Sequence, residues 1–183
     1  PLRPFAPSQG VRRINNEKHM KVFWSYAKLD NKKPHKLTKL REALSVILDE
    51  TTGAPNNILI DEIDLQWGVP WKQKIEELIR SSDSMISILT PSYFNSRMCI
   101  YEFKYAFEHK IAVYPLYYRE PNNGFRSSFT EDENDENDEN IALNLASRKI
   151  GDIQYRDFRK YRNKKMSCEE VQNFLDQLAN EIA

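Results

Sequence analysis

Apolar and polar positions fall into short blocks along the chain, and these blocks predict strands separated by helices. Three apolar runs, each followed directly by polar residues, are typical of buried strands: Lys21–Tyr26, Ile58–Ile60 and Met85–Leu89. A fourth run, Ile111–Tyr117, contains Pro115, which favours a place near the edge of a sheet or an early end. A short fifth strand is predicted over Ile153–Phe158.

Between these runs, apolar residues recur every three or four positions, as they do on one face of an amphipathic helix. One stripe precedes Gly53, which is placed to end its helix, and consists of Leu37, Leu40, Leu44, Ile47 and Leu48. A second, shorter stripe consists of Ile75, Leu78 and Ile79. These two patterns predict one helix after the first strand and one after the second.

Two further helices are indicated by capping residues. Ser96 can cap a helix that carries Cys99, Glu102 and Phe103. Ser167 with Glu170 predicts a capping box. The helix after that box has an apolar stripe of Val171, Phe174, Leu175, Leu178 and Ile182.

Strands that alternate with helices predict an α/β fold, because a helical crossover returns the chain to a parallel strand. We expect a flavodoxin-like three-layer sandwich, with a five-stranded parallel sheet and helices on both faces. Ligands of such sheets bind beyond the carboxyl ends of the strands. The polar and aromatic residues at those ends are Asp61, Trp67, Trp71, Thr90 and Glu102.

The 183 residues are expected to form one domain, residues 21–183, after a flexible lead of residues 1–20. No apolar run approaches the ~18 residues of a membrane span, so no membrane contact is expected. Only two cysteines, Cys99 and Cys168, are present, which favours a reducing cytoplasm. The chain begins without Met, so we expect a fragment of a longer protein or a chain that retains tag residues.

The formal net charge is zero, but the charges are unevenly distributed. Glu131 and the three tandem copies of Asp-Glu-Asn that follow it hold seven of the 27 acidic residues, and we expect this repeat to be disordered within a loop of residues 120–140. A basic cluster follows, formed by Arg156, Arg159, Lys160, Arg162, Lys164 and Lys165. No aromatic interleaving or binding motif accompanies this cluster, so a solvated face is favoured over a nucleic-acid interface.

Several common sites are excluded by the residues present. The five glycines are too scattered for a P-loop or a dinucleotide fingerprint. The three histidines do not cluster with the cysteines at metal-ligand spacing, so no metal site is expected. There is no G-x-S-x-G elbow. Carboxylates and aromatic residues at the carboxyl ends of strands remain as candidate chemistry.

The segments KVFWSYA, DEIDLQWGVPWKQKI and SDSMISILTPSYFNSRMCIYEF follow one another along the chain, and together they resemble TIR (Toll/interleukin-1 receptor) domains of the bacterial type that cleaves NAD⁺. KVFWSYA resembles the first-strand box, and DEIDLQWGVPWKQKI resembles the loop after the second strand. SDSMISILTPSYFNSRMCIYEF resembles the third strand and the helix that carries the catalytic glutamate of the family. The S-x-x-C-x-x-E spacing is the most specific of these features. The resemblance covers roughly Lys21 to the C-terminus.

The resemblance implies hydrolysis of the bond between nicotinamide and ribose in NAD⁺, with NAD⁺ as the substrate and no cofactor. Glu102 matches the catalytic glutamate. Nicotinamide leaves from a nitrogen that is already cationic, so one carboxylate can suffice without the general acid of ordinary glycosidases. The residues that match the family's substrate pocket are Tyr26, Ala27, Asp61, Gly68, Trp71, Met98 and Cys99.

Structural interpretations of the same residues stay open. Asp61 and Asp64 can be turn formers, and Trp71 can be a core residue. Cys99 is expected to be a small buried packing residue rather than a nucleophile. Many relatives have tryptophan at the position of Met98, and a methionine stacks less rigidly on a flat ring, so turnover or product preference can differ.

Three functions remain open. The first is an NAD⁺-consuming immune or anti-phage effector, activated when TIR domains associate, with the loop Leu65–Trp71 of one domain packing against another. The second is a non-catalytic adaptor that uses the same loop for contacts between TIR domains. The third is an enzyme that makes a cyclic ADP-ribose variant, and no residue separates it from the first. The partners implied are NAD⁺, other TIR domains and a fused sensor or oligomerisation domain.

Overall fold

The computed structural model describes residues 19–60, 71–120, 150 and 153–183. Residues 1–18 of the predicted lead, the loop after the second strand and the acidic repeat therefore lie outside the described residues. The expectations for these segments stay predictions.

The sheet consists of five parallel strands in the order β2-β1-β3-β4-β5. Their bounds are β1 Lys21–Ser25, β2 Asn57–Ile60, β3 Ser84–Leu89, β4 Ala112–Tyr117 and β5 Arg156–Asp157. This order confirms the α/β, flavodoxin-like fold that the alternating pattern predicts. β1 lies between β2 and β3, so its carboxyl end is flanked by the carboxyl ends of two other strands, at the edge where parallel sheets bind ligands.

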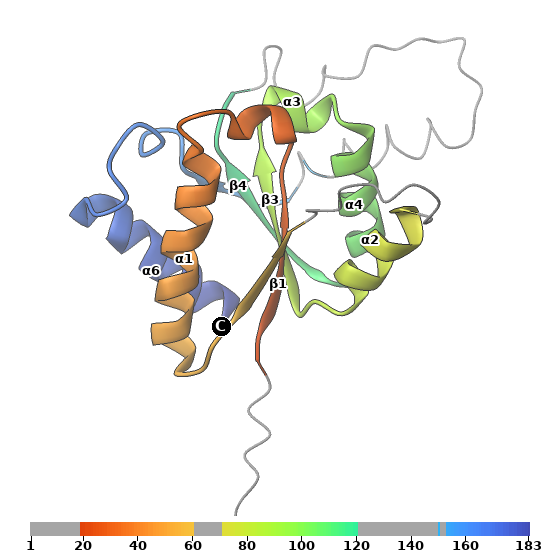
Figure 1. Cartoon of the computed structure of the whole chain (residues 1–183), viewed down its shortest axis with the longest axis horizontal. Helices are drawn as coiled ribbons and strands as arrows, with labels where there is room; N and C mark the ends of the chain where they lie inside the picture. Colours follow the sequence, from red (N-terminus) through yellow and green to blue (C-terminus); the bar gives the residue numbers. More distant parts are fainter. Residues whose placement is uncertain (1–18, 61–70, 121–149, 151–152) are drawn as a thin grey trace, which may run out of the picture.

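Helices cover both faces of the sheet and form the three predicted layers (Figure 1). One layer contains α1 (Lys36–Thr52) and α6 (Glu169–Ile182), and the opposite layer contains α2 (Trp71–Arg80) and α4 (Arg97–Glu108). Two short helices lie at the carboxyl edge of the sheet: η1 (Lys28–Asn31) and α3 (Pro91–Phe94).

The strands separate two apolar cores because successive side chains point to opposite faces. In β1, Val22 and Trp24 pack into the core under α1 and α6, whereas Phe23 packs into the core under α2 and α4. Trp24 is 1% exposed, which confirms that it is a core residue. The predicted stripe of α1 is buried in full.

Pro115 lies one strand from the edge, as its missing N–H predicts. Its register partner in β3 is Ser87, whereas β5 pairs only with the two following positions, Leu116 and Tyr117. The fifth strand is therefore present, but it is shorter than the predicted Ile153–Phe158.

α1 ends at Gly53, as predicted, with φ 68° in the left-handed region that glycine adopts without strain.

The predicted capping box of Ser167 and Glu170 is wrong. The N-cap of α6 is Cys168, and no side chain caps this helix end. Glu170 instead forms an ion pair with Lys164 on the preceding segment, which withdraws its carboxylate from the reciprocal contact that a capping box needs.

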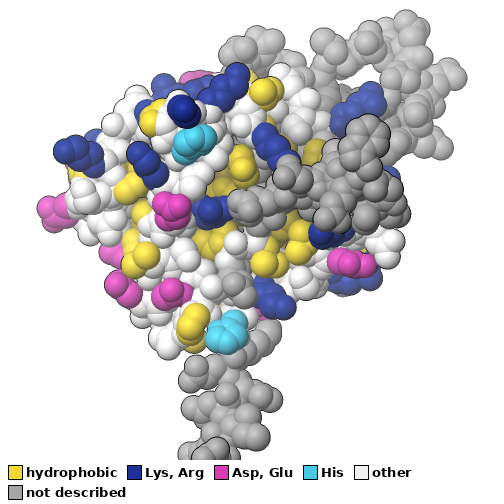
Figure 2. All heavy atoms as spheres, viewed as in Figure 1, with side chains coloured by type: hydrophobic (Ala, Val, Ile, Leu, Met, Phe, Trp, Pro, Cys, Tyr) yellow, Lys and Arg dark blue, Asp and Glu magenta, His cyan; other side chains and the backbone are white. Residues whose placement is uncertain are grey.

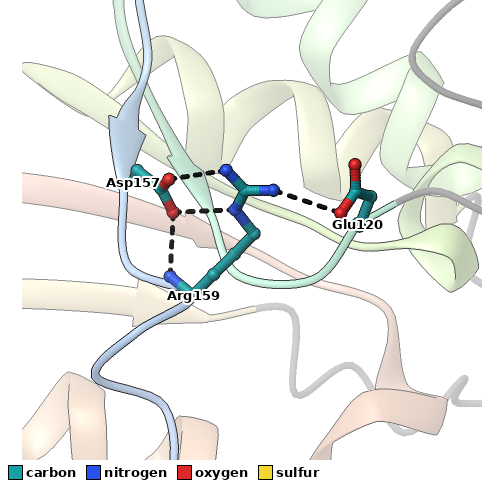
Figure 3. Close-up of polar contacts among 3 residues, drawn as sticks. All are labelled: Glu120, Asp157 and Arg159. Atoms are coloured by element: carbon teal, nitrogen blue, oxygen red, sulfur yellow. Dashed lines mark hydrogen bonds and ion pairs between the residues drawn. The ribbon is translucent and has the colours of Figure 1, made fainter.

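The basic cluster is partly neutralised by nearby carboxylates. Figure 3 shows Arg159 between Asp157, at 2.7 Å, and Glu120, at 3.2 Å. The hydrogen bonds from Arg159 lower the pKa of Asp157. Arg156 pairs with Glu181 on α6. These ion pairs support the interpretation of the cluster as a solvated face.

Among the described residues, no helix combines the length and the apolar character needed to cross a bilayer.

Replacing Leu44 in α1 with alanine is expected to lower the free energy of unfolding by about 2–5 kcal/mol, because it leaves a cavity in a fully buried core. Val46 is the matched control, since it lies on the same helix and is 58% exposed. Val46→Ala should change the free energy of unfolding by less than about 0.5 kcal/mol. Urea unfolding followed by tryptophan fluorescence measures both, and equal losses would contradict the assigned faces of α1.

Candidate functional site

A cavity of about 490 Å³ opens at the carboxyl edge of the sheet, and we call it the Glu102 cavity. Its described lining comes from the segment after β1, from α2 and from the α3–α4 region: Tyr26, Ala27, Lys28, Leu29, Trp71, Ile75, Ser92, Asn95, Ser96, Met98, Cys99 and Glu102. The volume lies in the range of small-molecule sites, about 300–1,000 Å³. The cavity lies at the carboxyl ends of the strands, where ligands of parallel sheets bind.

Glu102 is positioned by α4, whose start is fixed by a side-chain cap. The hydroxyl oxygen of Ser96 accepts a hydrogen bond of 3.3 Å from the backbone N–H of Cys99. Cys99 and Glu102 are three residues apart, so both lie on the helix face that lines the cavity. Glu102 is only 3% exposed, which is unusual for a carboxylate.

Ser25 holds the Glu102 carboxylate from the end of β1. Its hydroxyl donates a hydrogen bond of 2.5 Å to Oε2 of Glu102. Ser25 is 1% exposed, so the contact is shielded from water. A short hydrogen bond from a hydroxyl to a carboxylate is strong and favours the ionised form. Ser25 lies within the predicted run Lys21–Tyr26, and sequence analysis assigned it no role.

Tyr93 is a buried residue in contact with Ser25, and sequence analysis missed it. Thr90 caps α3 by accepting a 3.0 Å hydrogen bond from the N–H of Tyr93. The Tyr93 hydroxyl donates to the carbonyl of Cys99 at 3.2 Å and lies 3.2 Å from Oγ of Ser25. Burial raises the pKa of Tyr93 well above its ordinary value, and nearby Cys99 and Glu102 raise it further. The phenol therefore stays protonated and remains a donor.

Most of the residues suggested by the resemblance line this one cavity. Ala27 and Cys99 are buried in its wall, Tyr26 and Met98 are half-buried, and Trp71 is 37% exposed. Cys99 is thus a buried residue of the wall, in keeping with a packing role. Asp61 and Gly68, which the resemblance also suggests, lie outside the described residues.

Trp71 is the first residue of α2, and its exposure argues against a place in the core. Its ring lies edge-on to Tyr101 of α4, with centroids 6.3 Å apart. The Tyr101 hydroxyl donates to Glu76, and Lys72 lies 4.7 Å from the centre of the Tyr101 ring. Partial burial and the contact with Glu76 raise the pKa of Tyr101. This cluster fixes the start of α2 against α4.

A second carboxylate, Asp30 of η1, organises the same edge of the sheet. Its side chain is 4% exposed and accepts hydrogen bonds from Thr90 at 2.5 Å and from Ser92 at 3.2 Å. Arg119, which follows β4, lies 3.7 Å away. Asp30 thus connects the chain after three strands. Sequence analysis assigned Asp30 no role, because no local pattern marks a contact between positions 60 residues apart.

The described residues contain no group of three or more His, Cys, Asp or Glu side chains that could hold a metal ion.

A family model described as "TIR domain" matches residues 22–173. The chain belongs to the TIR-domain family. This match extends through all five strands and into α6, and it confirms the resemblance to TIR domains as a family.

Among solved structures, this TIR domain is similar to the TIR domains of the activated Roq1 resistosome that directly recognizes the pathogen effector XopQ. The sequence identity is 20% and the TM-score is 0.63, with 90% of this chain and 99% of that chain covered. The likeness shows the fold. No curated protein matches this TIR domain.

Replacing Tyr93 with phenylalanine is expected to lower the free energy of unfolding by about 1–3 kcal/mol, because it removes a buried donor from the carbonyl of Cys99. Tyr114→Phe is the matched control, since its hydroxyl donates to the carbonyl of Glu181 at an exposed site. The control should lose less than about 0.5 kcal/mol. Denaturant unfolding compares the two, and a loss in Tyr93→Phe no larger than in the control would contradict the role of the phenol.

Proposed function

We propose that this TIR domain is an NAD⁺ glycohydrolase that cleaves the bond between nicotinamide and ribose, with Glu102 as the catalytic residue. The observation that carries the proposal is a buried carboxylate that opens into a cavity at the carboxyl edge of the sheet. Burying a carboxylate opposes folding, and a hydrophobic residue would be more favourable for stability. A function in the cavity accounts for its presence.

The arrangement suits a reaction in which positive charge develops on the sugar. As the bond to nicotinamide lengthens, its electron pair leaves with the neutral base and the ribose becomes an oxocarbenium-like cation. An ionised Glu102, already oriented by Ser25, stabilises that cation without reorganising. No proton donor to the leaving group is required, which fits a site with one carboxylate in its described lining.

The aromatic and sulfur-containing wall suits a flat ring. Trp71 offers an exposed indole at the cavity, and Met98 offers a polarizable thioether. We propose that these side chains contact the nicotinamide or ribose, together with Tyr26, Ala27 and Cys99 in the described wall. Asp61 and Gly68 are proposed to contact the substrate from the loop that follows β2.

We propose that association of TIR domains activates the enzyme. The likeness to TIR domains of an activated resistosome supports this proposal. We also propose an immune or anti-phage role in the cytoplasm, with a fused sensor or oligomerisation domain. The product is linear ADP-ribose or a cyclic variant, and chromatography of the reaction products distinguishes the two.

Glu102→Gln is expected to reduce nicotinamide release from NAD⁺ by about 10²-fold or more, because one charge at the reacting centre stabilises the transition state by several kcal/mol. The assay uses concentrated or artificially clustered protein. Glu108→Gln is the matched control: it makes the same chemical change on the same helix, at an exposed residue paired with Lys104. This control should retain full activity.

Equal activity of Glu102→Gln and the native protein would overturn the catalytic assignment. A native protein that releases no nicotinamide in any clustered form would favour the non-catalytic adaptor, in which the same surface serves contacts between TIR domains.

Ser25→Ala is expected to lower kcat about tenfold, because Glu102 loses a short hydrogen bond that orients its carboxylate. Ser84→Ala is the control, since Ser84 is also buried in the sheet and its hydroxyl has no hydrogen-bond partner among the described residues. Measuring the pH dependence of kcat separates positioning from folding. A positioning role predicts that the acid limb of the Ser25→Ala profile moves to higher pH, and an unmoved limb would contradict it.

A further inference from the structure

A second cavity of about 570 Å³ borders the Glu102 cavity, and the two share Leu29 and Ser92 in their walls. We call it the basic cavity, because its charged lining comprises Lys32, Lys33, Lys36 and Arg119 with the single carboxylate Asp30. The two cavities are therefore neighbours along one edge of the sheet. Figure 2 shows Lys and Arg side chains gathered above the amino-terminal end of α1.

The positive charge of the basic cavity is incompletely compensated. The carboxylate of Asp30 is directed at Thr90, Ser92 and Arg119. Lys36 donates to the neutral side chain of Asn163 at 2.8 Å, a contact that adds no negative charge to the cavity. Within the described parts of the chain, Lys32 and Lys33 form no ion pair, and both are exposed. The cavity thus presents cations to whatever enters it.

The segment that carries these lysines is ordered by its own hydrogen bonds. The N–H of Asp30 donates to the carbonyl of Ala27 at 2.8 Å, and the N–H of His35 donates to the carbonyl of Lys32 at 3.0 Å. The side chain of Asn31 bonds to Thr38 at 2.8 Å. An ordered segment presents its cations with a smaller entropic cost on binding.

We propose that the basic cavity binds a phosphate group of the dinucleotide whose nicotinamide end occupies the Glu102 cavity. The inference rests on the proposed function, since it extends that substrate beyond the reacting bond. Phosphate oxygens form strong charge-assisted hydrogen bonds with lysine and arginine. Lys28, in the wall of the Glu102 cavity, lies on the same segment as Lys32 and Lys33. This segment therefore carries a lysine side chain in the wall of each cavity.

This assignment makes Lys32 and Lys33 determinants of substrate specificity. They are distant in the chain from Glu102 and contribute to binding rather than to the bond-breaking step. Binding energy from a phosphate that does not react is the same in ground and transition states, so its loss raises KM and leaves kcat unchanged.

The test is a double charge reversal, Lys32→Glu with Lys33→Glu. The matched control reverses Lys21, the first residue of β1, and Lys110, in the turn just before β4, both on the opposite edge of the sheet. Binding of ADP-ribose, measured by calorimetry, should weaken about tenfold in the first variant and less than twofold in the control. KM for NAD⁺ should rise about tenfold with kcat within twofold, whereas the inhibition constant of nicotinamide riboside, which has no phosphate, should not change.

Each outcome decides the assignment. Unchanged ADP-ribose binding would overturn it, and so would equal weakening of nicotinamide riboside. Weaker binding of inorganic pyrophosphate with unchanged ADP-ribose binding would assign the cavity to a separate phosphate ligand and also overturn the proposal. If the native protein cleaves no NAD⁺, the proposed function fails, but ADP-ribose binding still tests the basic cavity. Melting temperatures of both variants confirm that they fold.

Discussion

The burial of one carboxylate at the carboxyl edge of a parallel sheet constrains the rest of this structure. Glu102 is 3% exposed, and its stability in the ionised form depends on polar contacts. Ser25 supplies one of these at 2.5 Å, from the end of a strand that is paired on both sides. The site therefore requires that β1 and α4 be held in register by the two apolar cores around them.

Two buried carboxylates at this edge have different environments. Asp30 accepts from two hydroxyls and has Arg119 at 3.7 Å, so its charge serves to join the segments after β1, β3 and β4. Glu102 receives the Ser25 hydroxyl and opens into a cavity of about 490 Å³. The first arrangement stabilises the loop conformation, and the second leaves a carboxylate beside a space for a ligand. Because of this difference we propose a catalytic role for Glu102 and assign a structural role to Asp30.

Sequence analysis located much of the site because its residues follow strands or lie on a capped helix. Glu102, Cys99, Met98 and Trp71 all line the cavity that was expected at the strand ends. Asp30 and the hydrogen bond from Ser25 were missed, since their partners are distant in sequence. Tyr93 was missed although two of its partners, Thr90 and Cys99, are close to it in the chain. The capping box at Ser167 failed for a different, local reason, because an ion pair with Lys164 engages Glu170. Asp61 and Gly68 stay predictions, since they lie outside the described residues.

The sequence by itself determined the strands, the end of α1, the start of α4, the parallel α/β class and the family, because these depend on local periodicity, capping residues and short motifs. Tertiary structure alone decided which polar groups meet. The contact of Ser25 with Glu102 joins positions 77 residues apart, and that of Asp30 with Thr90 joins positions 60 apart. Such contacts arise from the register of the strands and the packing of helices on both faces, which a local pattern does not encode.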